Sequence, residues 1–285
     1  MKGWSRSEQE VVREVVGSPI AESRRLSGGC VGDVWKVKGQ SGLEVVVKRG
    51  GPSLDREALM LEALGDVDGV PVPQVLYGRS ELLVMEYVEH DGRRGDRGEE
   101  EVAQALVKLH EQSAESYGFE EDTLIGGLVL KNGWESDWRR FFGEKRLLDM
   151  GRRALEVGRM GRSVMRRVEA VVDDLERFIP APQAPGLVHG DIWSGNILFD
   201  QGGLAALIDP AIYYGDPEVE LAFIGLFHTL GEAFYRRYGE ERPIDEGFFE
   251  VRRDVYNLFP LLVHIRLFGG TYVGQIEATL DRLGH

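Results

Sequence analysis

The chain lacks several sequence features that mark disulfide-rich, metal-binding, membrane and secreted proteins. It contains 285 residues but a single cysteine, Cys30, so it has no internal disulfide framework. Its six histidines are scattered without the spacing of a metal site. No apolar run approaches the roughly 20 residues that span a bilayer, and the N-terminal residues lack a signal-peptide pattern. We therefore expect a cytoplasmic protein that does not bind membranes.

Positive charge is also scarce. The 34 lysine and arginine residues are outnumbered by 48 aspartate and glutamate residues, which gives a formal net charge of -14. Because nucleic-acid binding depends on clustered basic residues, this balance argues against a nucleic-acid partner. Any anionic ligand must instead meet a local positive charge.

The pattern of strands and helices changes along the chain. Residues 24–50 predict three strands with a glycine-rich turn between the first two, residues 53–65 predict a helix, and residues 71–88 predict two more strands. Helical patterns dominate from about residue 99. We therefore predict an α+β fold with two lobes: a small β-rich lobe over residues 1–90 and a mainly helical lobe over residues 91–285.

A cluster of polar residues lies within the otherwise apolar segment "LVHGDIWSGNILFDQGGLAALIDP", residues 187–210. Asp191 and Asn196 have the D-x-x-x-x-N spacing of a kinase catalytic loop, and Asp209 follows a second apolar run, as if at the other end of a hairpin. Phosphoryl transfer needs a carboxylate to accept a hydroxyl proton, and carboxylate and amide oxygens to hold magnesium. Each residue alone is equally compatible with a turn or a strand-end cap.

The first lobe contains features that suit a nucleotide. Gly28, Gly29 and Gly32 allow backbone N–H groups to approach an anion, although such a turn is often only a hairpin and no Walker A lysine follows. Lys48 ends an apolar strand, where a kinase places the lysine that contacts the α- and β-phosphates. The alternative is a strand-end lysine that extends into solvent.

The helix that follows offers Lys48 an acidic partner. Helical geometry places Glu57 within about 30° of the centre of the apolar face and Glu62 more than about 100° away. A glutamate in an apolar face needs a cation, so we predict an ion pair between Lys48 and Glu57. Backbone groups of residues 86–88, Glu86, Tyr87 and Val88, are predicted to meet an adenine edge at an interlobe hinge, or simply to continue a core strand.

The motifs "HGDIWSGNILF", "LIDPAIYYGDPEVELA" and "NGWESDWRRFF" resemble those of the fructosamine kinase family. The resemblance spans residues 28 to about 227 and implies a protein-kinase-like fold, with ATP and Mg²⁺ as cofactors. It implies phosphorylation of the 3-hydroxyl of ketosamines, free or protein-bound, as a deglycation step. It also implies that Asp191 is the base, that Asn196 and Asp209 bind magnesium, and that Lys48 and Glu57 form the nucleotide-side pair.

The acceptor is expected to be small, because only a few residues separate Asp209 from the amphipathic helical pattern "DPEVELAFIGLF" and leave no room for a peptide platform. Trp134, Trp193 and Asp216 are the predicted substrate residues. Trp138, in the same segment as Trp134, is expected to help wall the sugar pocket. The alternatives are that Trp134 and Trp138 anchor the core and that Asp216 caps the helix at Pro217. His110 is expected to be structural.

Two other functions remain open at this stage. One is a phosphotransferase for an aminoglycoside or a choline-type amino alcohol, and the other is a nucleotide-binding regulator without catalysis. The family resemblance also associates a cysteine in the phosphate loop with redox control. We therefore predict a monomer that oxidation links through Cys30 into a homodimer, the alternative being that Cys30 only packs beneath the loop.

Overall fold

The computed structural model describes residues 3–26, 32–51 and 53–285. Three residues of the predicted phosphate loop, Gly28, Gly29 and Cys30, lie outside the described residues. Their assigned roles, including the Cys30-linked dimer, stay predictions. Within the described residues, no helix is both long enough and apolar enough to cross a membrane.

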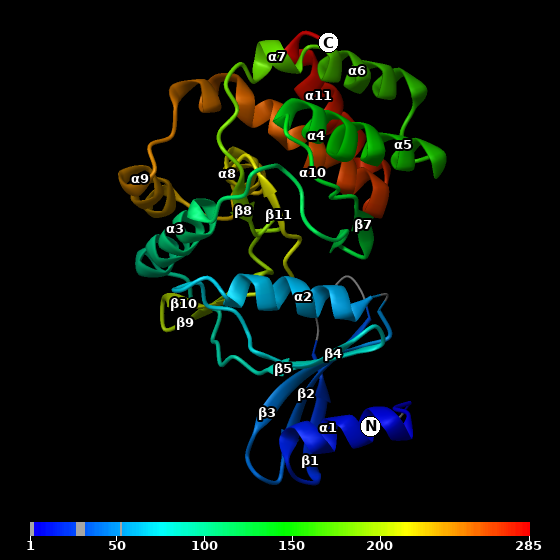
Figure 1. The fold of residues 1–285 in the computed structure, drawn as a ribbon, viewed down its shortest axis with the longest axis vertical. Coiled ribbons are helices and arrows are strands. Elements are labelled where there is room, and N and C mark those ends of the chain that lie inside the picture. Colours follow the sequence, from blue (N-terminus) through cyan, green and yellow to red (C-terminus); the bar gives the residue numbers. More distant parts are fainter. Residues whose placement is uncertain (1–2, 27–31, 52) are drawn as a thin grey trace.

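The N-terminal part is a five-stranded sheet in the order β1-β2-β3-β5-β4, with all neighbouring strands antiparallel. The helix α1 packs on one face and α2 on the other, and α2 lies between the sheet and the helical part of the molecule (Figure 1). The elements are α1 Arg6–Val16, β1 Ile20–Arg25, β2 Asp33–Gly39, β3 Glu44–Arg49, α2 Leu54–Gly65, β4 Val75–Arg79 and β5 Leu82–Glu86.

The period-two alternation of β3 orients Lys48. Val45 and Val47 pack against α1, whereas Val46 packs on the opposite face with α2. Lys48 therefore points from the sheet toward α2 and the helical part of the chain.

The predicted order of three strands, a helix and two strands is confirmed, but the first strand was placed too late. The prediction began it at Arg24, whereas β1 runs from Ile20 to Arg25. This strand lies at the edge of the sheet and most of its side chains are exposed, so its residues show little apolar alternation to mark its start.

The remaining chain is mainly helical and contains the largest hydrophobic core. The predicted boundary at residues 90 and 91 falls in the segment between β5 and α3. The elements are α3 Asp96–Glu111, β6 Thr123–Ile125, β7 Leu128–Leu130, α4 Trp138–Phe141, the π-helix η1 Phe142–Leu148, α5 Asp149–Glu156, α6 Arg162–Asp173, α7 Leu175–Phe178, β8 Gly186–Val188, β9 Ile197–Asp200, β10 Gly203–Leu207, β11 Tyr213–Gly215, α8 Glu218–Leu226, α9 Glu232–Glu241, the π-helix η2 Phe248–Arg252, α10 Arg253–Phe268, the 3₁₀-helix η3 Gly270–Tyr272 and α11 Val273–Leu283.

Two short antiparallel pairs carry the polar cluster. β9 pairs with β10, so that Ile197 lies opposite Leu207, and β8 pairs with β11. The amide of Ile208 donates to the carbonyl of Asn196 (3.0 Å), which extends the first pair by one step. The predicted hairpin is thus present, and it brings Asn196 and Asp209 side by side.

The helix predicted after Asp209 is present as α8, but it is not amphipathic. Its residues from Glu218 to Ile224 are all buried. Two buried glutamates in this helix have partners: Glu218 binds Arg252 through two contacts of 2.6 and 2.8 Å, and Glu220 binds His110. Paired carboxylates therefore occupy positions that the sequence pattern assigned to a solvent-exposed face.

Candidate active site

Lys48 is the centre of a buried ion cluster where the sheet meets the helical part. Its Nζ atom lies 2.6 Å from Oε1 of Glu57 and also contacts Oδ1 of Asp209. The predicted Lys48–Glu57 pair is confirmed, and Glu62 is exposed as the helical geometry indicated. The contact with Asp209 was not predicted, because it joins residues 161 positions apart.

The two carboxylates keep this lysine charged. Burial by itself would lower the pKa of Lys48, but the attraction of Glu57 and Asp209 outweighs burial and raises that pKa. Lys48 therefore stays an ammonium group, and it is the one cation of this cluster, in which two carboxylates offset its charge.

Asp191 and Asn196 are held together in the loop between β8 and β9. The side-chain Nδ2 of Asn196 donates to the carbonyl oxygen and to Oδ2 of Asp191, both at 2.9 Å. Burial raises the pKa of Asp191 to about 7, although the hydrogen bond from Asn196 acts in the opposite direction. The Asp191 carboxyl group is thus adapted to exchange a proton near neutral pH.

Asp209 has a backbone conformation that few residues adopt. Its φ angle of 54° lies in the left-handed region, where aspartate is better tolerated than most side chains. The flanking backbone is fixed, since Ile208 donates to Asn196 and Ala211 donates to the carbonyl of His189 (2.7 Å). The bend places the Asp209 side chain beside Lys48.

Glu220 supports the loop that carries Asp191, and the sequence motifs did not identify it as a site residue. Its Oε1 accepts from the amide of Gly190 (2.7 Å), and its Oε2 accepts from the amide of His189 (3.1 Å). Gly190 has a φ angle of 82°, and a Cβ atom there would overlap the Ala211 carbonyl oxygen. Glu220 lies within the quoted motif "DPEVELA", but no local pattern indicated which backbone it would bind.

His110 is a structural residue, as predicted. It is buried, with Nδ1 2.7 Å from the Tyr238 hydroxyl and Nε2 3.1 Å from Oε2 of Glu220. Burial lowers the pKa of His110. Burial alone would raise the pKa of Glu220, but the hydrogen bond from His110 and its other contacts outweigh burial and lower it.

A cavity of about 420 Å³ adjoins Asp191 and Trp193. Of the three predicted substrate residues, only Trp193 lines it. Trp134 is 47% exposed and packs against Tyr214 with ring centroids 6.0 Å apart.

Asp216 is buried, and both of its carboxyl oxygens have hydrogen-bond partners in the protein. It accepts hydrogen bonds from the amides of Gln183 and Glu218 and from the Tyr256 hydroxyl. The capping alternative therefore describes Asp216 better than a substrate contact does. Trp138 is likewise a core residue, 1% exposed.

The predicted hinge residues differ in their backbone contacts. The amide of Glu86 donates to Gln74 (2.9 Å) and that of Tyr87 to Glu44 (3.4 Å). The Val88 amide has no hydrogen-bond partner among the described residues, and the Val88 carbonyl is 2.9 Å from Nδ1 of His90. Of these three N–H groups, the one at Val88 is therefore open to a ligand.

Asn196 and Asp209 have the donor chemistry of a magnesium site. Among the described residues, the side-chain hydrogen bonds of Asn196 all use Nδ2 as the donor, and no N–H or O–H group donates to its Oδ1. In the part of the chain that the structure describes, no group of three or more His, Cys, Asp or Glu side chains is arranged to hold a metal. Magnesium commonly takes one or two protein oxygens and completes its shell with phosphates and water, so this pair fits it.

Replacing Lys48 by methionine should leave two carboxylates without their cation: Glu57, which is 16% exposed, and Asp209, which is 31% exposed. We expect Lys48→Met to lower the free energy of unfolding in urea by about 3–5 kcal/mol. The matched control is Lys38→Met, which removes an exposed ion pair with Glu44 and should cost at most about 1 kcal/mol. Equal stability of the two variants would contradict the ion cluster.

Replacing Glu220 by glutamine should turn an amide N–H toward backbone N–H donors. We expect Glu220→Gln to destabilise the protein by about 1.5–3 kcal/mol and to slow turnover by displacing the loop that carries Asp191. Glu232→Gln, at an exposed position of α9, should stay within about 0.5 kcal/mol of the parent. Urea unfolding curves and steady-state rates of both variants measure these effects. Parental stability and parental turnover of Glu220→Gln would refute the positioning role of Glu220.

Comparison with known proteins agrees with this geometry. The model of the family described as fructosamine kinase matches residues 4–285. The protein-ribulosamine 3-kinase of Arabidopsis thaliana chloroplasts is 30% identical over 287 residues, covering 95% of this chain and 85% of the relative.

Solved structures show the same fold. A crystal structure from Thermobifida fusca, of a protein assigned as a fructosamine-3-kinase, has a TM-score of 0.88 and 33% identity, covering 98% of this chain and 99% of the other. An aminoglycoside phosphotransferase, solved with AMP-PNP and hygromycin B, has a TM-score of 0.68 at 17% identity, covering 98% and 99%. The predicted protein-kinase-like fold is therefore confirmed, and the chain belongs to the fructosamine kinase family of phosphotransferases.

Proposed function

We propose that this kinase transfers the γ-phosphoryl group of ATP to the 3-hydroxyl of a ketosamine, on a free or protein-bound amine. The observation that supports this most strongly is the position of Asp191. Its carboxyl group is bound to Asn196 beside the Lys48 ion cluster, and it also borders the cavity. Asp191 thus adjoins both a site for an anion and a site for a small acceptor.

On the nucleotide side, Lys48 is the fixed cation that contacts the phosphates, and Glu57 holds it in place. The Val88 amide is available to the adenine edge. The AMP-PNP in the structure of the aminoglycoside phosphotransferase supports ATP as the donor. Asn196, through Oδ1, and Asp209 would hold Mg²⁺, which would neutralise phosphate charge.

On the acceptor side, Asp191 acts as the base. Its carboxylate accepts the proton of the 3-hydroxyl while the hydroxyl oxygen forms a bond to the γ-phosphorus. The bond from that phosphorus to the β,γ-bridging oxygen breaks, and ADP leaves. The raised pKa of Asp191 suits this proton transfer at neutral pH.

Phosphorylation at this position makes deglycation chemically accessible. When the ketosamine enolises toward the carbon that carries nitrogen, the phosphate becomes an allylic leaving group. Its loss and hydrolysis of the resulting imine release the free amine. We therefore propose that the product is an intermediate in removing sugars from amines.

A substrate panel tests the function. ADP formation is measured with the ketosamines derived from fructose, ribulose and erythrulose, with hygromycin B, and with choline. We expect turnover only with ketosamines. Turnover of hygromycin B or choline without any ketosamine activity would overturn the proposal, and no turnover with any acceptor would favour a nucleotide-binding regulator.

Asp191→Asn should retain the size of the side chain but lose the base. We expect turnover to fall by at least about 10²-fold while the affinity for ATP stays the same. Asp200→Asn, at the end of β9, is the control and should keep parental turnover. Parental turnover of Asp191→Asn would remove Asp191 from the catalytic role.

Asp209→Ala should remove one magnesium ligand and leave Lys48 still paired with Glu57. We expect a folded protein in which Mg²⁺ no longer increases the affinity for ATP. Calorimetric titration of ATP with and without Mg²⁺ measures this, and an unchanged magnesium effect would exclude Asp209 as a ligand.

A further inference from the structure

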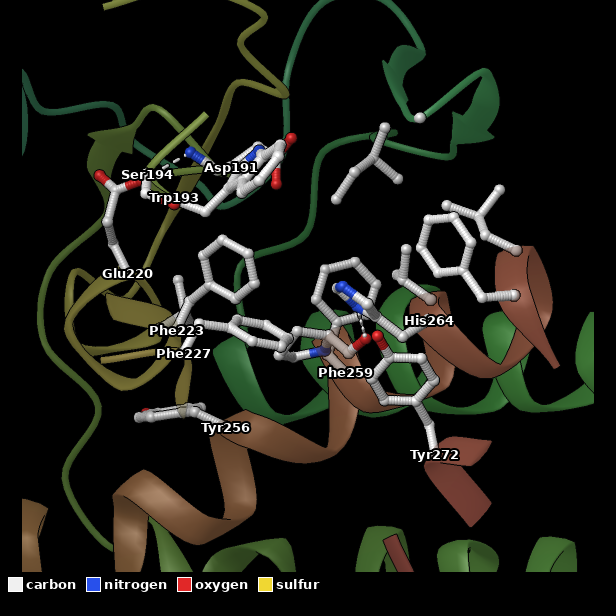
Figure 2. Close-up of a pocket in the computed structure, with 18 of the residues that line it drawn as sticks. Asp191, Trp193, Ser194, Glu220, Phe223, Phe227, Tyr256, Phe259, His264 and Tyr272 are labelled. Carbon is white, nitrogen blue, oxygen red and sulfur yellow. Dashed lines mark hydrogen bonds between the residues drawn. The ribbon is translucent and has the colours of Figure 1, made fainter. Parts of the chain in front are cut away.

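The cavity beside Asp191 has two chemically different ends. Asp191, Trp193 and Ser194 form one end, and α10 with the residues after it forms the other (Figure 2). The side chains at the second end are predominantly apolar or aromatic: Phe259, Val263, His264, Leu267, Phe268 and Tyr272. Only the first end offers carboxyl and hydroxyl groups close to the proposed base.

Several polar groups in the wall are already used by the protein. Both oxygens of Glu220 accept from the catalytic loop, and the Tyr256 hydroxyl donates to Asp216 (2.9 Å). His264 donates through Nδ1 to the carbonyl of Pro260 (2.8 Å). Burial lowers the pKa of His264, which favours the uncharged ring. Apart from Nε2 of His264 and the hydroxyl of Tyr272, the end remote from Asp191 therefore presents carbon surface.

The charge of the wall excludes an anionic group. No lysine or arginine is among the described residues that line the cavity, whereas Asp191 and Glu220 bring negative charge to it. A carboxylate at the remote end would lose its water without gaining a cation, which is costly. An uncharged apolar group meets no such penalty.

The size of the cavity matches a ligand with two parts. A volume of about 420 Å³ lies within the range of small-molecule pockets, about 300–1,000 Å³. A sugar needs polar partners for its hydroxyls and finds them near Asp191. The remaining space, along α10, suits a hydrophobic substituent.

We propose that this remote end, lined by Val263, His264, Leu267 and Phe268, binds the amine substituent of the ketosamine and selects substituents that are apolar, uncharged and large enough to include a ring. The proposal rests on the proposed function and specifies its substrate class. Leu267 is a specificity-determining position, because it is partly exposed, lines the cavity and packs against Gly126, which also lines it.

The test uses three ketosamines with the same sugar, made from benzylamine, methylamine and glycine. The value of kcat/KM is measured for each with the parent enzyme. We expect the benzylamine derivative to exceed the other two by about tenfold or more, because a filled hydrophobic pocket discriminates on that scale.

A single substitution should reverse the preference. Leu267→Lys places a cation in the apolar end, so we expect the kcat/KM ratio of the glycine derivative to the benzylamine derivative to rise about tenfold or more. Val129→Lys makes the same change of side-chain type at the exposed residue of β7, outside the cavity, and should leave that ratio unchanged. A ratio within one protein is insensitive to partial loss of folded enzyme.

The outcomes separate the two proposals. Phosphorylation of all three derivatives with kcat/KM values within twofold of one another, or a preference for the glycine derivative, overturns the apolar subsite and leaves the proposed function standing. If none of the three derivatives is phosphorylated, the proposed function is overturned, and the subsite proposal fails with it. An unchanged ratio in Leu267→Lys overturns the role of Leu267.

Discussion

The arrangement of the site depends on the burial of one positive charge. Lys48 extends from β3 into the junction of the sheet, α2 and the β9–β10 hairpin, where a lone ammonium group would be unstable. Glu57 from α2 and Asp209 from the end of the hairpin compensate it. One ion cluster thus fixes three elements relative to one another, and the same cluster supplies the cation that a phosphate ligand needs in an acidic chain.

Much of this arrangement could be predicted from the sequence, because it follows from local periodicity. Strand alternation ended an apolar run at Lys48, helical geometry distinguished Glu57 from Glu62, and two apolar runs around a tight turn indicated the hairpin that brings Asn196 to Asp209. Each of these inferences needs only the residue periodicity of a single helix or strand and the free-energy cost of an unpaired buried charge.

The remaining features depend on tertiary packing. Glu220 reaches the loop of Gly190 from a helix that the pattern had assigned to the surface, and the cavity forms only where α10 packs near that loop. Trp134 and Asp216 had suitable chemistry for a sugar, but one lies on the surface and the other is enclosed. Composition and spacing do not determine whether a residue lines the cavity, lies on the surface or is enclosed in the core.

The central claim is phosphoryl transfer to a ketosamine at a defined hydroxyl, and the product itself tests it most directly. The enzyme is incubated with ATP, Mg²⁺ and a ketosamine, and the product is analysed by proton and carbon NMR with and without phosphorus decoupling. We expect phosphorus coupling to the proton on carbon 3 and to carbon 3 and its neighbours. Coupling centred on another carbon, or no phosphorylated ketosamine at all, would contradict it.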